Sequence, residues 1–285
     1  MRAATPETGD VAAAARSVSL HVILLRAADV APRPTWVKST LRRRVVFMHG
    51  WWQDHTSWLT TAQRVREKFG HDCLLLDWPG MGLSETPRAD VMGADLLLAA
   101  LRRTLERVGW ADGATPLTLC GCSLGGAIAM RYTSTWPATV DRLVLIAPAG
   151  FDEKRPSLIF RFLIWLNRHT VAAAPASASA EEAPAWPKAH WLLQQLRLVR
   201  TTPRYDAELD WFQTAAARRP LRVVCATHDE LHNAYLWAGG RRADPTFRLT
   251  FCCANHGLLC VSIARLKLWE DAENWHGEAV PSSKL

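Results

Sequence analysis

The sequence lacks any apolar run long enough to cross a membrane. A membrane-spanning helix needs about 18 or more consecutive apolar residues, whereas stretches such as Leu143–Ala149 have only the length of a strand. The seven cysteines form no paired CxxC motif, and an odd count argues against a complete disulfide framework. We therefore expect a globular chain from a reducing compartment, without a transmembrane segment.

The sequence also lacks a concentration of positive charge. Its net charge is +7, but Lys and Arg are scattered among Asp and Glu, and no recognition-helix, zinc-finger or RNA-binding signature occurs. Gly80-Met81-Gly82 has neither the full dinucleotide fingerprint nor a phosphate-loop lysine. No cluster has the sequence spacing of a metal site, since Cys252-Cys253 with His256 is more simply a strand and a base. We expect no nucleic-acid partner, no cofactor and no metal.

Strand and helix patterns alternate along most of the chain. This order predicts an α/β fold, with a mostly parallel twisted sheet and helices on both of its faces. The core should comprise residues 17–150 and 220–276, with a helical cap inserted at 151–219 and flexible termini at 1–16 and 277–285. The expected strands are 17–26, 44–48, 73–77, 117–121, 143–147, 221–226 and 247–253, and the expected core helices are 56–69, 93–108, 124–135 and 257–269.

A GxSxG pentapeptide, Gly121-Cys122-Ser123-Leu124-Gly125, lies between an apolar strand pattern and a helix pattern. A nucleophilic serine must stand on a sharp turn with its hydroxyl above the sheet, and small neighbours avoid clashes there. The pentapeptide alone is a modest signal, because an idle serine on a Gly-rich turn has the same letters. Its strand–turn–helix context favours a nucleophile at Ser123.

Five segments, in order, resemble the α/β-hydrolase superfamily, specifically its cap-bearing esterases, lipases and C–C hydrolases. They are Val45–Trp51, Asp77–Ser84, the GxSxG turn, Leu143–Pro148 and the surroundings of Asp229 and His256. The resemblance covers roughly residues 41–270. It implies an α/β-hydrolase fold and the catalytic order Ser, then Asp or Glu, then His.

Ser123, Asp229 and His256 follow that order along the chain. A serine hydroxyl needs a base within hydrogen-bond reach, so His256 would accept the proton of Ser123. Asp229 would hold the imidazole of His256 in the productive tautomer. Asn255 stands where the family often has a glycine before this histidine, and Asn also tolerates unusual backbone angles.

Several neighbouring residues are alternatives or helpers in this scheme. Glu230 is adjacent to the proposed acid, and Asp152 follows the preceding strand, where some relatives carry the acid. His49 resembles the structural His-Gly pair of the family. The backbone N–H groups of Trp51 and Leu124 should form the oxyanion hole.

The resemblance implies a serine hydrolase that cleaves a carboxylic ester through an acyl-enzyme intermediate. Apolar faces on the expected cap helices favour a hydrophobic, lipid-like substrate. An acyl-CoA thioesterase and a C–C bond hydrolase are alternatives on the same fold. A non-catalytic binding protein that keeps the fold is the alternative of another class.

The sequence closes on Ser283-Lys284-Leu285. A free SKL tripeptide at a C-terminus is an import address that the peroxisomal receptor reads. We therefore expect a peroxisome or a peroxisome-like organelle (the glycosome) as the location, and the cytoplasm otherwise.

Overall fold

The computed structural model describes residues 13–15, 17–29, 42–87, 91–150, 220–228 and 247–255. The cap expected at 151–219, the closing helix expected at 257–269 and the tail 277–285 lie outside these residues. The described part is the sheet with the helices that flank it, and it contains the serine turn.

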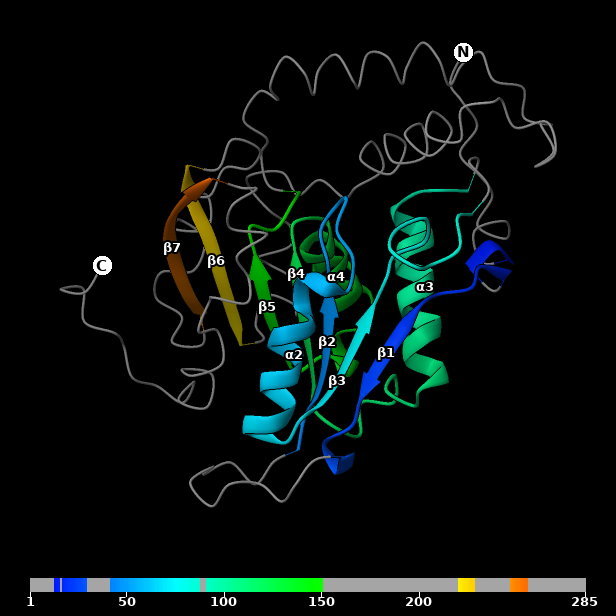
Figure 1. The fold of residues 1–285 in the computed structure, drawn as a ribbon, viewed down its shortest axis with the longest axis horizontal. Helices are drawn as coiled ribbons and strands as arrows, with labels where there is room; N and C mark the ends of the chain where they lie inside the picture. Colours follow the sequence, from blue (N-terminus) through cyan, green and yellow to red (C-terminus); the bar gives the residue numbers. More distant parts are fainter. Residues whose placement is uncertain are drawn as a thin grey trace, which may run out of the picture.

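A seven-stranded sheet in the order β1-β3-β2-β4-β5-β6-β7 runs through the described part (Figure 1). The strands are β1 (Val22–Leu25), β2 (Arg44–Met48), β3 (Asp72–Leu76), β4 (Leu117–Cys122), β5 (Arg142–Ile146), β6 (Leu221–His228) and β7 (Phe247–Asn255). β1 pairs antiparallel with β3, and every other neighbouring pair is parallel. The predicted mostly parallel sheet is confirmed, and the carboxyl ends of β2 to β7 meet at one edge.

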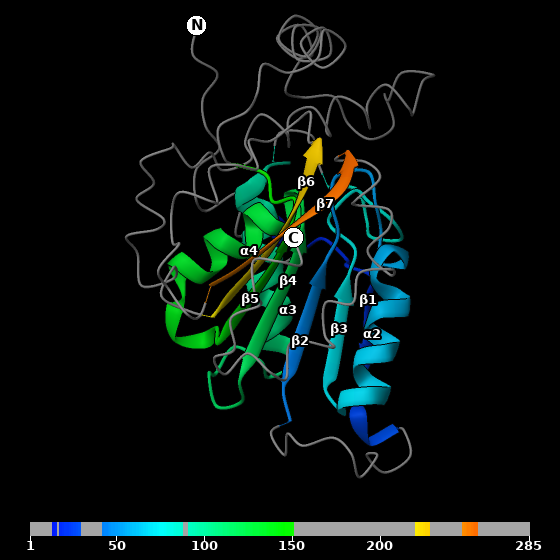
Figure 2. The ribbon, with the colours of Figure 1, turned by 90° about the vertical axis from the view of Figure 1, so that its left-hand side faces the viewer.

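Helices cover both faces of this sheet. They are α2 (Thr56–Phe69), α3 (Ala94–Arg107) and α4 (Leu124–Thr135), with the short 3-10 helices η1 (Ala27–Asp29) and η2 (Pro137–Thr139). α2 lies on one face, whereas α3 and α4 lie on the other (Figures 1 and 2). Within the described residues, every helix is too short or too polar to span a membrane.

Alternate residues of each central strand enter two separate cores. In β2, Val46 and Met48 pack in the core beneath α3 and α4, whereas Val45 and Phe47 pack in the core beneath α2. Successive side chains of a strand point to opposite faces. A strand covered on both faces is therefore apolar on both faces, as Val45–Met48, Cys73–Leu76 and Leu143–Ile146 are.

The first strand begins later than the sequence predicts. The expected strand 17–26 forms only over Val22–Leu25. The N–H of Val18 and the hydroxyl of Ser17 both donate to the carbonyl of Ala14, each at 3.0 Å. These bonds keep Ser17 and Val18 in a helical turn, although the alternating pattern of the segment favours a strand.

The cysteines whose side chains the structure describes are free thiols. They are Cys73, Cys120, Cys122, Cys225 and Cys252. The first four are buried between the sheet and its helices. Burial raises the pKa of the Cys73 and Cys120 thiols above the ordinary value, so both are protonated at neutral pH.

Candidate active site

Ser123 stands on the turn between β4 and α4, at the carboxyl edge of the sheet. Its backbone has φ 48° and ψ −113°, and a positive φ is uncommon for a residue with a side chain. Its N–H donates to the carbonyl of Ile146 at 2.9 Å, and its carbonyl accepts the N–H groups of Ala127 and Ala149 at 3.1 and 3.0 Å. The turn therefore has the strained, well-held backbone of a nucleophile elbow.

The glycines around Ser123 are required by close backbone approaches. A methyl group at Gly121 would lie 2.4 Å from the carbonyl oxygen of Gly125, and one at Gly125 would lie 2.4 Å from that of Met48. A methyl group at Gly126 would lie 2.8 Å from Cβ of Pro148. The first turn of α4 is thus packed directly on the ends of its neighbouring strands, and this packing fixes the position of the serine.

The segment after β2 turns back beside the serine. A methyl group at Gly50 would lie 3.3 Å from Cβ of Ser123. The N–H of Gln53 donates to the carbonyl of Gly50 at 3.3 Å, and the side-chain Oε1 of Gln53 accepts the N–H of Gly50 at 2.7 Å. Trp51 and Trp52 form the centre of this four-residue turn, and Trp52 has φ 60°.

Of the predicted site residues, the structure brings Ser123, Leu124 and Trp51 to one place. Leu124 is the first residue of α4, where backbone N–H groups have no partner inside the helix and the helix dipole is positive. Trp51 follows Gly50, which lies beside the serine side chain. The two predicted oxyanion donors therefore come from the elements that flank Ser123.

His49 lies behind this turn as a buried, neutral imidazole. Its Nδ1 donates to the carbonyl of Gly50 at 2.8 Å, and its Nε2 accepts the backbone N–H of Trp78 at 3.1 Å. The indole N–H of Trp78 donates to the carbonyl of His49 at 2.9 Å. Burial lowers the pKa of His49 to about 4. Because both ring nitrogens are engaged, His49 is a structural residue, as the resemblance implies.

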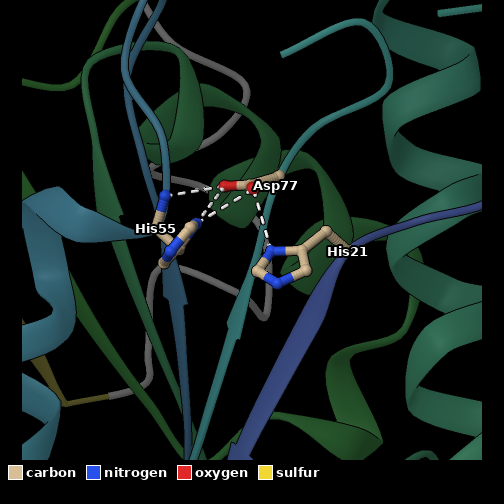
Figure 3. A group of neighbouring side chains, drawn as sticks. All are labelled: His21, His55 and Asp77. Carbon is tan, nitrogen blue, oxygen red and sulfur yellow. Dashed lines mark hydrogen bonds and ion pairs between the residues drawn. The ribbon is translucent and has the colours of Figure 1, made fainter. Parts of the chain in front are cut away.

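Asp77, which follows β3, is a buried carboxylate whose role the sequence reasoning missed (Figure 3). Its Oδ1 accepts the N–H of His55 at 2.7 Å, and its Oδ2 accepts the N–H of Leu83 at 2.9 Å. Nδ1 of His21 and Nδ1 of His55 each lie 3.0 Å from Oδ2. Burial alone would raise the pKa of Asp77, but the hydrogen bonds from Leu83 and His55 hold it below its ordinary value. The carboxylate ties together β1, the segment after β2 and the segment after β3.

Exposed apolar side chains lie at the carboxyl edge of the sheet. The rings of Trp51 and Trp52 are stacked, with centroids 4.2 Å apart and planes at 17°. Trp52 is 51% exposed and Leu83 is 73% exposed. They follow β2 and β3, so both belong to the edge of the sheet that carries Ser123.

The predicted base and acid lie outside the described residues, as do the alternative acids. These residues are His256, Asp229, Glu230 and Asp152. The tripeptide Ser283-Lys284-Leu285 also lies outside them, so the predicted import address stays a prediction.

The strands that precede the predicted acid and base are described. β6 ends at His228 and β7 ends at Asn255, and these two residues are partners in the parallel register. Asp229 and His256 are the next residues in the sequence. Both therefore follow strands that end at the same edge of the sheet as β4, which Ser123 follows.

Comparisons with known proteins agree with this architecture. A family model described as the alpha/beta hydrolase family matches residues 45–266. An uncharacterized protein of Mycobacterium tuberculosis is 32% identical over 123 residues, which are 41% of this chain and 32% of that protein. A human 1-acylglycerol-3-phosphate O-acyltransferase, ABHD5, is 32% identical over 124 residues, which are 42% of this chain and 35% of that protein. The matched part spans about a third of the length of these curated relatives.

Solved structures share the fold over most of the chain. A carboxylesterase structure from Nitrososphaera gargenis superposes with a TM-score of 0.59 at 15% identity, over 90% of this chain and 93% of that one. A bromoperoxidase from Bacillus anthracis superposes with a TM-score of 0.58 at 15% identity, over 90% and 94%. At this identity the likeness concerns the fold alone. The family model, the strand order and the strained serine turn agree, and the chain belongs to the alpha/beta hydrolase family.

Proposed function

We propose that this chain is a serine hydrolase that cleaves a carboxylic ester through an acyl-enzyme formed on Ser123. The observation that carries the proposal is the backbone of Ser123, whose φ of 48° is held by flanking hydrogen bonds and by the glycines packed around it. Strain of this kind persists where the surrounding fold imposes it, and it concentrates at functional sites. A serine on such a turn presents its hydroxyl above the sheet.

The proposed reaction has two steps with one base. Oγ of Ser123 attacks the ester carbonyl carbon while His256 takes the hydroxyl proton, and that proton then passes to the departing alcohol. Water attacks the acyl-serine, gives a proton to His256 and releases the carboxylic acid, and the serine regains its proton. Asp229 would hold the imidazole and stabilise its cation. The position of both residues directly after β6 and β7 supports these roles.

The oxyanion of each tetrahedral intermediate would be bound by backbone N–H groups. The donors are Leu124 at the first position of α4 and Trp51 beyond Gly50, which lies against Ser123. Preorganised donors stabilise the charge that develops in the transition state, and losing one costs about 3–4 kcal/mol. The positive end of the α4 dipole acts in the same direction.

The proposed substrate has an apolar acyl or alcohol part. The stacked Trp51 and Trp52 and the exposed side chain of Leu83 give the edge around Ser123 an apolar surface. Such a surface favours hydrocarbon over charged groups, because contact removes both from water. A curated relative whose name is that of an acylglycerol-phosphate acyltransferase is consistent with a lipid-like substrate.

Fluorophosphonate labelling tests the nucleophile. Wild type should be labelled, and Ser123→Ala should lose both labelling and esterase activity, with kcat falling by about 1,000-fold or more. Ser134→Ala is a matched control, because Ser134 lies on α4 and its hydroxyl donates to the carbonyl of Met130 at 3.1 Å, one turn earlier. This control should label as wild type does. Failure to label wild type would favour the non-catalytic binding protein.

A substrate panel tests the bond that is cleaved. We expect kcat/KM for p-nitrophenyl esters to rise with acyl-chain length, because each added methylene buries apolar surface worth about 0.8 kcal/mol. The panel should include acyl-CoA thioesters and a vinylogous keto acid. Turnover of thioesters alone, or of the C–C substrate alone, would contradict the ester assignment while leaving Ser123 as nucleophile.

A further inference from the structure

Two imidazoles and one carboxylate converge at a point that the proposed hydrolysis does not use (Figure 3). His21 immediately precedes β1, His55 immediately precedes α2, and Asp77 immediately follows β3. One ligand-type atom from each residue lies within 4.8 Å of the others. Because the three positions are far apart in the sequence, no spacing motif announces the cluster.

The shortest contacts share a single carboxylate oxygen. Nδ1 of His21 and Nδ1 of His55 each lie 3.0 Å from Oδ2 of Asp77. In a tetrahedral zinc site the ligand atoms lie about 2.0–2.1 Å from the metal, and hence roughly 3.3 Å from one another. The two nitrogen-to-oxygen separations are close to that value, and all three ligand atoms lie within 4.8 Å of one another. A shift of the three side chains around a common centre would therefore admit an ion.

The carboxylate has the charge and the support that a metal ligand needs. Asp77 is fully buried, and its two carboxylate oxygens accept the N–H groups of His55 and Leu83 at 2.7 and 2.9 Å. A methyl group at Gly82 would lie 2.3 Å from Cγ of Asp77, so the backbone closes directly over the carboxylate. Hydrogen bonds to a ligating carboxylate fix its orientation and tune its affinity for metal.

We propose that His21, His55 and Asp77 bind a divalent transition-metal ion, with Zn²⁺ as the expected occupant. The ligands are Nδ1 of each imidazole and a carboxylate oxygen, a nitrogen-and-oxygen set that zinc accepts. The His21 and His55 side chains are 29% and 14% exposed. Solvent can therefore supply the fourth ligand. The ion would neutralise a buried negative charge, which is the energetic reason for its binding.

The site is separate from the proposed catalytic chemistry but is joined to it through the backbone. His55 is the last residue of the segment between β2 and α2, which begins with His49 and Gly50 and contains Trp51. A bound ion would add a bond between this segment and β1. Because none of the three ligands takes part in the proposed hydrolysis, the metal-site proposal does not depend on Ser123 being a nucleophile.

Cobalt and zinc titrations of the full chain, after treatment with a chelator, test the site. Wild type should take up one Co²⁺ per chain with the visible absorption of four-coordinate cobalt and without a thiolate-to-cobalt band, and Zn²⁺ should displace it. His21→Asn and His55→Asn are the matched variants. The amide nitrogen of Asn can donate the same hydrogen bond to Asp77 that Nδ1 donates, but it is a poor metal ligand.

Each Asn variant should bind at least about 100-fold more weakly, since removing a ligand should exceed the 10–100-fold effect of removing an outer partner. Its melting temperature without metal should stay near that of wild type. His276→Asn, a change at another histidine of the sequence, should bind as wild type does. The proposal is overturned if wild type takes up no cobalt, if the spectrum shows thiolate ligands, or if the Asn variants bind as tightly as wild type.

Discussion

At the scale of the residue, Trp52 combines a large exposed ring with a backbone conformation that suits glycine. Its φ is 60° at the third position of the turn that Gly50 and Gln53 close. For a residue with Cβ, the left-handed region costs about 1–2 kcal/mol. The ring of Trp52 stacks on the ring of Trp51. The fold therefore keeps this aromatic pair on the turn next to Ser123, although the backbone of Trp52 is strained.

Two substitutions at Trp52 separate the ring from the strain. Trp52→Ala removes the ring and keeps the strained Cβ, whereas Trp52→Gly removes both. We expect Trp52→Gly to be more stable than Trp52→Ala by about 1 kcal/mol, measured by urea unfolding. At an ordinary position the order is the reverse, by about 0.5–1 kcal/mol. The ordinary order at Trp52 would contradict the strain, and both variants should lose activity toward long acyl chains.

His49 should make stability fall in mild acid. Burial lowers its folded pKa to about 4, whereas an unfolded histidine titrates near about 6.5. Between these values the unfolded chain binds a proton that the folded chain excludes, so the free energy of unfolding falls as pH decreases through this window. The loss in the free energy of unfolding that is due to His49 is on the order of 3 kcal/mol by about pH 4, and there is no loss above about pH 6.5.

Urea unfolding at a series of pH values, with His49→Asn beside wild type, measures this contribution. The Asn amide can still donate to the carbonyl of Gly50 but does not titrate. The stability advantage of wild type over the variant should therefore shrink from about pH 6.5 to about pH 4. Parallel pH profiles for the two proteins would show that His49 is not held neutral by the fold.

At the scale of the element, the junction of β4 and α4 leaves no room for a side chain. Gly125→Ala would place a methyl group 2.4 Å from the carbonyl oxygen of Met48, which is backbone and cannot move without displacing β2. We expect a loss of at least about 3 kcal/mol in the free energy of unfolding. We also expect loss of fluorophosphonate labelling, because the shift moves Ser123.

Gly109→Ala is the matched control for that substitution. Gly109 has φ +69°, and an added methyl group would meet nothing within 4 Å. Its cost should therefore be backbone strain alone, about 1 kcal/mol. Thermal or urea unfolding of both variants gives the comparison, and equal losses would mean that steric contact is not what requires glycine at position 125.

The sequence predicts well those strands that are buried on both faces of the sheet. The apolar runs at β2, β4 and β5 have the length and composition of strands covered on both faces, and the structure has them within a residue of the expected bounds. The prediction was wrong at residues 17–21. Ser17 and Val18 bond back to the carbonyl of Ala14, whereas the N–H groups of Ser19 and His21 donate to the side chains of Glu85 and Ser84 instead of to a strand. The residue pattern does not encode these contacts.

The candidate site was predictable in part for the same reason. Ser123, Trp51 and Leu124 belong to short motifs in which position along the chain determines position in the fold. The Asp77 cluster was missed, because His21 reaches it only through the antiparallel pairing of β1 with β3. Asp77 lies directly after an apolar strand, at the edge of the sheet that also carries Ser123. That position could have identified Asp77, but not the two histidines, from the sequence.

At the scale of the whole molecule, the sheet separates two clusters of buried side chains within the described residues. Leu97 of α3 is buried in one core and Val65 of α2 is buried in the other. Leu97→Ala should cost about 2–5 kcal/mol, and Val65→Ala should cost less because it removes less volume.

The two losses should add in the double variant. Substitutions without shared partners are additive within about 0.3–0.5 kcal/mol. The free energy of unfolding of Leu97→Ala, Val65→Ala and the combined variant, measured in urea, tests this independence. A coupling well above that range would mean that the sheet transmits packing changes between its faces.

The buried thiols of β4 should react differently in the folded and the unfolded chain. Cys120 and Cys122 point into the core beneath α2, and Ser123 directly follows them at the carboxyl edge of the sheet. A maleimide should not react with these two thiols in the folded chain, because they are buried, and it should react with them once the chain unfolds. A serine-directed phosphonate should do the reverse, because the proposed role of Ser123 as nucleophile depends on the assembled turn. Two reagents on neighbouring residues would then count the folded and unfolded molecules in the same sample.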